Sequence, residues 1–244
     1  MKKFWLILFL SWVFTGSGGG EENYLLEYQP SSQIYIYHHY LQGRLESKKE
    51  ASTVHLQFLR HWQLSESGQK KLLLREWGEK YQGSSFDLSQ LGLPLPGERI
   101  ERIIDRYGRV VKVMRYPEGH RYYLNLLVFP DHPVPVGKSW KYSYQVQFEL
   151  YGRSVPGTCE ILYTLDKVLD YKNQKSAKIL IQARCQAGEQ STPQLDLSYQ
   201  GKVFFDLINK KEVDYLLKIS WSKIEPEENQ KEIANLELYS IFEQ

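Results

Sequence analysis

The chain has 244 residues, with 31 basic and 29 acidic side chains, and 42% of its residues are hydrophobic and 14% aromatic. This composition excludes a disordered protein, because so many apolar side chains support a folded core. The near balance of charge provides no electrostatic basis for binding nucleic acid or anionic membranes, so neither is expected as a partner.

Residues 1–20, MKKFWLILFLSWVFTGSGGG, have the organisation of a signal peptide. Lys2 and Lys3 precede an uncharged, mostly apolar run from Phe4 to Phe14, and small residues follow it. A membrane anchor is the alternative, but this run is shorter than the ~20 apolar residues that a spanning helix needs. We therefore expect cleavage near Gly18 to Glu22, contact with the membrane only before cleavage, and a periplasmic or secreted protein.

Apolar and polar residues alternate along most of residues 21–244, for example from Lys141 to Leu150. This period of two is typical of antiparallel strands with one buried face. We expect an all-β fold of about a dozen strands and few short helices, arranged as a curved sheet or half-barrel in a single domain. Weak internal similarity suggests two halves, near 24–129 and 138–243, and a single unrepeated meander is the alternative. The expected strands are 33–41, 53–64, 70–81, 99–105, 109–116, 122–129, 141–150, 158–169, 177–185, 195–207, 213–222 and 234–242.

An apolar segment, Gly83 to Gly97, interrupts the strands. It combines a short helix capped by Ser84 or Ser85 with a turn rich in Gly and Pro. Its apolar side chains could cover the open end of the sheet, bind the tail of a ligand or form a partner patch, or the loop could simply seal the core. The candidate ligand-binding residues are Phe86, Leu88, Leu91, Leu93 and Leu95, together with Trp140 farther along the chain.

The pairing of residues across one hairpin can be predicted from the sequence. If Asp170 to Gln174 forms the turn, apolar residues of 158–169 face apolar residues of 177–185, and opposite charges also meet. In that register Cys159 lies opposite Cys185, and these are the two cysteines of the chain. Directly opposed cysteines suit a disulfide in an exported protein, so we expect this bond, with two buried free thiols as the alternative.

A proline-rich connector, Pro130-x-x-Pro133-Val134-x-Val136-Gly137-x-x-Trp140, leads into the strand at 141–150. It resembles the mid-chain signature of uncharacterised exported bacterial proteins rich in antiparallel strands, which are similar in general character to LolA/LppX-like half-barrel lipoprotein carriers. The resemblance implies a curved sheet whose apolar concave face shields an acyl chain or a hydrophobic peptide. It implies no catalytic residue, and the helical lid of such carriers is not evident in this chain.

Catalytic and metal-binding patterns were not found. The six histidines lack the pairing typical of metal sites, and we expect them on solvent-facing sides of strands; they are His38, His39, His55, His61, His120 and His132. Nucleophile, phosphate-loop and dinucleotide motifs are also missing, although a hydrolase site assembled from distant residues stays open.

The sequence therefore predicts an exported, non-enzymatic binding protein without a cofactor or metal, whose partner is a hydrophobic ligand or an envelope protein. One alternative is a structural component of the cell envelope that assembles through strand edges or the connector. The other is a small outer-membrane barrel, against which Arg60 stands among apolar neighbours on its strand face.

Overall fold

The computed structural model describes residues 22–48, 50–84, 86, 88–91, 93–116, 127–189, 192–227 and 230–243, so the expected signal peptide lies outside the described residues. The described chain is built from antiparallel strands and one short 3-10 helix, which confirms the predicted all-β fold. The elements are β1 (Asn23–Tyr24), β2 (Tyr35–Ser47), β3 (Ala51–Glu66), β4 (Lys71–Gly83), η1 (Leu88–Leu91), β5 (Arg99–Asp105), β6 (Val110–Arg115), β7 (Val134–Pro135), β8 (Ser139–Leu150), β9 (Arg153–Tyr171), β10 (Gln174–Ala187), β11 (Gln194–Asp206), β12 (Lys211–Glu225) and β13 (Gln230–Phe242).

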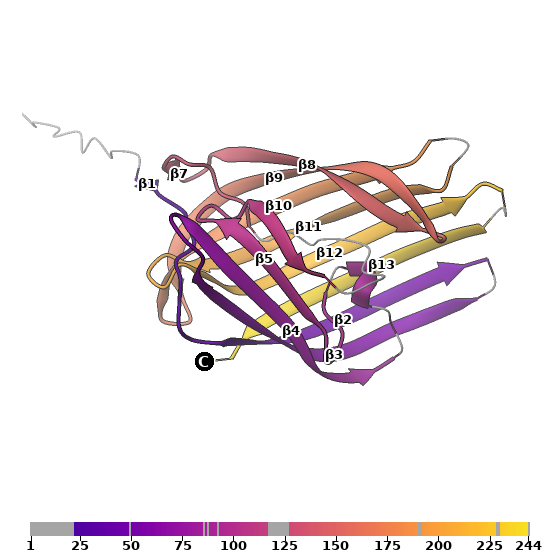
Figure 1. The fold of residues 1–244 in the computed structure, drawn as a ribbon, viewed down its shortest axis with the longest axis horizontal. Helices are drawn as coiled ribbons and strands as arrows, with labels where there is room; N and C mark the ends of the chain where they lie inside the picture. The colour runs from indigo at the N-terminus through magenta and orange to yellow at the C-terminus, as the bar shows by residue number, and fades with distance from the viewer. Residues whose placement is uncertain are drawn as a thin grey trace, which may run out of the picture.

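Eleven strands form one sheet in the order β6-β5-β4-β3-β2-β13-β12-β11-β10-β9-β8 (Figure 1). The first and last long strands, β2 and β13, pair in the middle, and the chain then extends as hairpins toward each edge. The strands of the two predicted halves thus lie on opposite sides of this central pair, while the duplication itself stays a prediction. Within the described residues, no strand pairs with the outer edge of β6 or β8, so the sheet is open.

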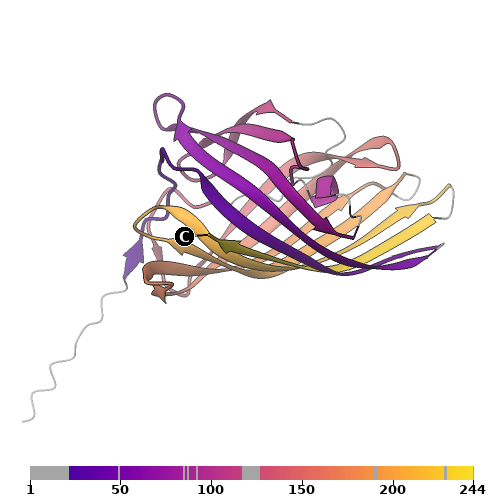
Figure 2. The same ribbon diagram turned by 90° about the horizontal axis from the view of Figure 1, so that it is seen from below.

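The sheet is strongly curved, and η1 lies inside the curve (Figure 2). Side chains alternate between the buried concave face and the outer face, most regularly along β10, where Ile181 and Ala183 are buried and Gln182 is exposed. This alternation follows from the two-residue repeat of a strand. The core of the protein therefore lies within the curve, as predicted for a curved sheet.

The β9–β10 hairpin has the predicted register along most of its length, including Tyr163 opposite Ile181. Its turn is shorter than predicted. Lys172 and Asn173 form a two-residue turn, and both have positive φ, at 51° and 61°. A bulge between Lys178 and Ile179 then shifts the pairing by one residue and brings the two strands into the predicted register.

The predicted disulfide between Cys159 and Cys185 is present and buried. The two residues are direct partners on β9 and β10. They alternate in phase with Tyr163 and Ile181, so the disulfide lies on the concave face of the sheet.

The predicted strand at 122–129 is wrong for the part that the structure describes, Leu127 to Phe129, which is irregular. These residues are buried, but their backbone bonds go elsewhere: the Phe129 N–H donates to the carbonyl of Tyr107, at 2.8 Å. Phe129 and Tyr28, which precedes β2, pack together with Phe205. These side chains fill one part of the core.

Among the described residues, no helix has the length and apolar character needed to cross a membrane.

Candidate binding site inside the half-barrel

The apolar segment between β4 and β5 lies against the concave face of the sheet. Phe86, Leu88, Leu91 and Leu93 are buried there, and Leu95 is partly buried. The ring of Phe86 lies 6.2 Å from the ring of Trp221 on β12. We call residues 86–95 the inner segment, of which the structure describes all but 87 and 92. Its position suits both the sealing loop and the ligand-covering segment considered from the sequence.

The inner segment is held at its two ends. The Tyr81 hydroxyl accepts a hydrogen bond from the Phe86 N–H at 2.9 Å and donates one to the Phe86 carbonyl at 2.5 Å. At the other end, the backbone of Pro94 and Leu95 packs directly on Gly78 of β4, where a Cβ atom would lie only 2.6 Å from the Pro94 carbonyl oxygen. Between these ends, the buried side chains of Leu88, Leu91 and Leu93 pack in the hydrophobic core.

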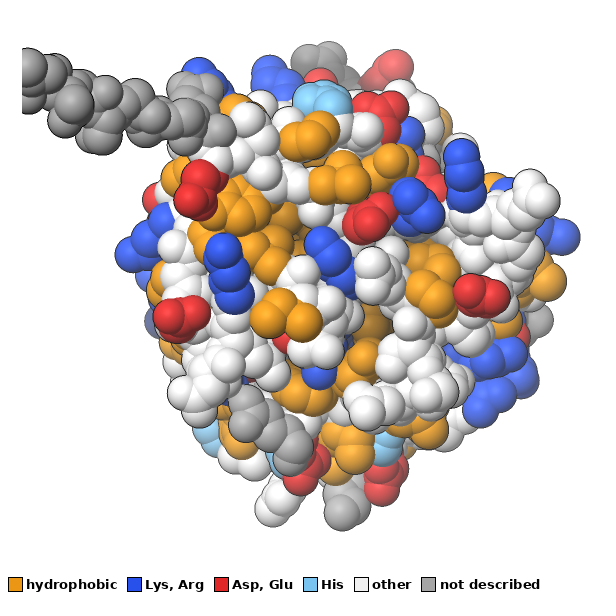
Figure 3. Space-filling model, turned by 90° about the vertical axis from the view of Figure 1, so that its left-hand side faces the viewer, with side chains coloured by type: hydrophobic (Ala, Val, Ile, Leu, Met, Phe, Trp, Pro, Cys, Tyr) orange, Lys and Arg blue, Asp and Glu red, His pale blue; other side chains and the backbone are white. Residues whose placement is uncertain are grey.

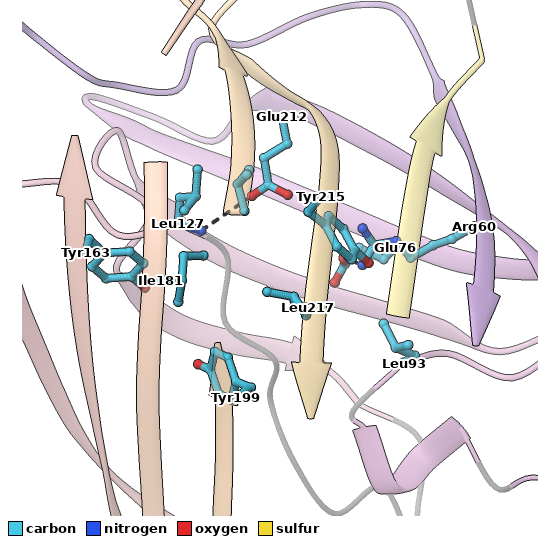
Figure 4. A pocket seen from close by; sticks show the side chains of 11 residues that line it. Arg60, Glu76, Leu93, Leu127, Tyr163, Ile181, Tyr199, Glu212, Tyr215 and Leu217 are labelled. Atoms are coloured by element: carbon cyan, nitrogen blue, oxygen red, sulfur yellow. Dashed lines mark hydrogen bonds and ion pairs between the residues drawn. The ribbon is translucent and has the colours of Figure 1, made fainter. Parts of the chain in front are cut away.

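Leu93 lines an internal cavity of about 40 Å³, which has room for a few water molecules but not for an acyl chain. One side of this cavity is formed by apolar and aromatic side chains, and the other side by charged ones (Figure 4). We call the inward-facing side chains of β9, β10 and β11 the apolar wall. Its members at the cavity are Tyr163, Ile181, Tyr199 and Val203.

Arg60 on β3 and Glu76 on β4 line the opposite side of the cavity, and Arg102 on β5 bonds Glu76 without lining it. We call these three residues the charged wall. All three side chains are buried. Arg60 Nη1 lies 3.2 Å from Glu76 Oε1, and Arg102 Nη2 donates to Glu76 Oε2. Burial alone would raise the pKa of the Glu76 carboxyl, but Arg102 and Arg60 together lower it. Glu76 is therefore an ionised carboxylate that two guanidinium groups share.

Glu212, at the start of β12, is a second buried carboxyl group at the cavity. Its Oε1 accepts hydrogen bonds from the Tyr28 hydroxyl at 2.8 Å and from the Leu127 N–H at 3.4 Å, the latter drawn in Figure 4. Burial raises the pKa of Glu212 even though Arg60 acts in the other direction. The Glu212 carboxyl is therefore protonated at a higher pH than that of Glu76.

His39 is buried on the concave face of β2, so the expectation that all the histidines face solvent is wrong for this residue. Its ring stacks on Phe58, with 4.6 Å between the ring centres, and Nδ1 lies 3.1 Å from the Tyr215 hydroxyl. Burial, and to a lesser extent Arg60, lowers the pKa of His39 well below its usual value. His39 is buried because it alternates in phase with Tyr37 and Leu41, which are core residues.

Trp140 lies at the start of the edge strand β8, where its indole N–H donates to the Val128 carbonyl at 2.6 Å. Its ring stacks on Tyr163, with 5.4 Å between the ring centres. Tyr142 and Tyr144 follow on the same face, stacked on each other and only partly buried. This edge of the concave face therefore carries a row of aromatic side chains that is partly open to solvent.

The surface at one end of the molecule contrasts with this interior. Seen from the left-hand end of Figure 1, hydrophobic side chains form small groups separated by charged and polar ones (Figure 3). Within the part of the chain that the structure describes, no group of three or more His, Cys, Asp or Glu residues is placed to hold a metal ion. The described part of the concave face combines apolar side chains with buried charged ones.

The structure brings Leu93 and Tyr163, the stacking partner of Trp140, together at the cavity. No pattern in the sequence singles out Glu76, Glu212 or Arg102 as site residues. Arg60 was visible as a charge on an apolar strand face, but its partners lie on other strands. A scan against protein-family models finds no match for this chain, and a search of curated protein sequences finds no significant relative.

Proposed function

We propose that this protein is an exported, non-enzymatic carrier that holds the apolar part of a ligand against the concave face of its sheet. One observation supports this proposal above all. Among the described residues, the elements that pack on the core from outside the eleven-stranded sheet are short: the inner segment, irregular chain around Leu127 to Phe129, and a two-stranded sheet of β1 and β7 that adds Val134. Such a cover can be displaced without breaking the hydrogen bonds between strands.

Simple energetics favour an exchangeable cover. Transfer of an acyl chain of about twelve methylenes from water to an apolar site gains roughly 10 kcal/mol, at ~0.8 kcal/mol per methylene. Exposing four buried apolar side chains, such as Phe86, Leu88, Leu91 and Leu93, costs on the order of 6–12 kcal/mol. The two quantities are similar, so a ligand would replace the inner segment reversibly.

Export is part of the same proposal. Residues 1–20 resemble a signal peptide, and the disulfide between Cys159 and Cys185 is compatible with an oxidising compartment outside the cytoplasm. A carrier in such a compartment would shield acyl chains or hydrophobic peptide segments from water.

The test uses N-phenyl-1-naphthylamine, an uncharged dye that fluoresces in apolar surroundings. Ala183 faces the interior beside Tyr199, so Ala183→Phe fills the space that we assign to the ligand. The matched control is Gln182→Phe, on the next residue of the same strand, whose side chain is exposed. We expect saturable dye binding to the wild type, binding at least tenfold weaker in Ala183→Phe, and unchanged binding in Gln182→Phe. Absence of binding to the wild type, or equal binding by both variants, would refute the carrier function.

A second candidate is a structural role in the cell envelope through a strand edge, and the composition of β6 favours it. Val111, Val113 and Met114 are exposed on this edge strand, at 51%, 39% and 52%. Exposed apolar edges are sites for pairing with another chain. Val113→Lys is expected to abolish crosslinking to an envelope partner while dye binding stays unchanged, and persistence of the crosslink would count against this role.

A further inference from the structure

We infer that the end of the β8–β9 hairpin is a flap that must open for a ligand to enter the concave interior. The flap consists of residues 147–156, which are the last residues of β8, the turn and the first residues of β9. This inference rests on the proposed carrier function and specifies its entry route. It follows from the pairing of the flap, from the side chains that it buries and from its contact with the β12–β13 hairpin.

The flap extends beyond the neighbouring strand β10. Its two arms pair with each other, from Gln147 opposite Pro156 to Leu150 opposite Arg153. The pairing of β9 with β10 ends at Gly157, so within the described residues no strand pairs with the flap on its β10 side. The flap can therefore move without breaking hydrogen bonds to an adjacent strand. Pro156, which has no backbone N–H to donate, lies at its base.

A cleft of about 450 Å³ separates the flap from the loop between β10 and β11. It is lined by residues 153–158 on one side and by residues 186–189, Thr192 and Pro193 on the other. Both the buried Val155 and Ala187 and the exposed Ser154 and Gln186 line it, so it lies in the fork between the two strands. Its volume is in the range of roughly 300–1,000 Å³ that is typical of small-molecule sites, so an acyl chain fits at this place.

In this structure the flap lies closed over one end of the concave face. Phe148, Leu150 and Val155 belong to the hydrophobic core, with exposures of 1%, 1% and 5%. A hairpin that only continued the edge of the sheet would leave such side chains open to water. Figure 1 shows the tip of the β8–β9 hairpin turned toward β12 and β13. The flap thus covers apolar surface that a ligand would otherwise reach.

An exposed ion pair holds the tip of the flap in this position. Arg153 Nη2 lies 2.5 Å from Glu227 Oε2 in the β12–β13 turn, and Nη1 lies 3.4 Å from Oε1. In the sheet, β10 and β11 separate β9 from β12, a distance of about 14 Å if the sheet were flat. Burial, followed by the charges of Glu232 and Glu225, raises the pKa of Tyr151 to about 12, so a second residue of the tip lies near β12 and β13. Exposed ion pairs are weak, which suits a contact that opens and closes.

The test locks the flap and measures the rate of dye binding. Arg153→Cys and Glu227→Cys are combined and joined by a bis-maleimide of about the length of the ion pair that it replaces. The native cysteines are paired and buried, so they do not react. We expect N-phenyl-1-naphthylamine to associate and to dissociate more slowly by about tenfold or more after crosslinking than before it, because a locked gate slows both steps.

The matched control is the exposed ion pair of Arg184 with Asp196, which joins the outer faces of β10 and β11 at 2.8 Å. These strands are paired at that place, so crosslinking Arg184→Cys with Asp196→Cys should leave both rates unchanged. In the opposite direction, Glu227→Gln weakens the closed state, and dye association should become about two- to fivefold faster. Asp196→Asn should have no such effect.

The outcomes separate this inference from the function on which it rests. If the dye binds the wild type but crosslinking of the flap leaves its rates unchanged, the carrier function stands and the flap is refuted as the entry route. Equal slowing in the control pair would also refute it. Weaker binding at an unchanged association rate would mean that the flap belongs to the site and is not a gate. If the dye does not bind the wild type, both proposals fail. Should the double cysteine variant not fold, unchanged association in Glu227→Gln would overturn the inference.

Discussion

The two sides of the interior differ in the kind of side chain that they bury. The apolar wall of β9, β10 and β11 has hydrophobic side chains and a disulfide at its inward positions, whereas β3, β4 and β5 place Arg60, Glu76 and Arg102 at theirs. A hydrophobic interior of similar volume would be at least as stable as a buried ion cluster. The apolar wall therefore packs without buried charge, whereas the charged wall keeps an ion cluster that stability alone does not require.

The largest expected effect is on the charged wall. Glu76→Gln removes the buried carboxylate that bonds both Arg60 and Arg102, so we expect the free energy of unfolding to fall by about 3–5 kcal/mol in denaturant titrations. Glu101→Gln, which removes a carboxylate of β5 that is paired with Arg75 nearer the surface, is the control and should cost at most about 1 kcal/mol. Equal effects of the two substitutions would show that the buried cluster does not depend on its charge.

On the apolar wall, the disulfide is expected to provide the next largest contribution. Replacing both Cys159 and Cys185 by Ala should lower the free energy of unfolding by about 2–4 kcal/mol, since the cross-link restricts the unfolded chain. Denaturant unfolding with and without reductant measures this, because reductant should affect the wild type and not the double variant. Labelling of both thiols in the unfolded wild type without reductant would contradict the bond.

A pH dependence is expected from His39. Its pKa in the folded protein is lowered, so below pH 6.5 the unfolded chain takes up a proton that the folded chain does not. Stability should therefore fall as the pH drops below 6.5, by up to about 1.4 kcal/mol per pH unit until the folded pKa is reached. The difference between wild type and His39→Gln isolates this contribution from the opposing one of Glu212, whose pKa is raised. Parallel pH profiles of the two proteins would disprove it.

The smallest effect concerns the inner segment. Tyr81→Phe removes the hydroxyl that bonds the N–H and the carbonyl of Phe86, at an expected cost of about 1 kcal/mol. Because the closed arrangement is weakened, uncharged dye should bind more tightly, by up to about fivefold. Tyr239→Phe, whose hydroxyl bonds the partly exposed Glu237, is the control for dye titrations. Weaker binding by Tyr81→Phe would mean that the segment is a fixed part of the site.

Much of the fold can be predicted because two of its signals are local. Apolar and polar residues alternate along each strand, and complementary residues lie opposite each other across a hairpin. The pattern of 158–185 indicates both the hairpin and its disulfide. The turn was harder to predict because Lys172 and Asn173 adopt positive φ without a glycine. The pairing of β2 with β13 joins the two ends of the described chain, and no local pattern indicates it.

The site is harder to predict from the sequence than the fold. The inner segment is visible as an apolar interruption between strands, and Leu93 does lie at the cavity. Arg60, Glu76 and Arg102 each occupy an inward position of a different strand. Their proximity depends on the register of two hairpins, so single strands show only isolated charges on apolar faces.

The central claim is that an acyl chain enters the concave interior, and paramagnetic relaxation of methyl signals tests it most directly. A fatty acid with a nitroxide at mid-chain should broaden the methyl signals of Ile181 and Leu217, which line the cavity. The signals of Leu180 and Val111, which are 37% and 51% exposed, should stay sharp. Broadening of Leu180 and Val111 with unaffected Ile181 and Leu217 would place the ligand on the outer surface and contradict the claim.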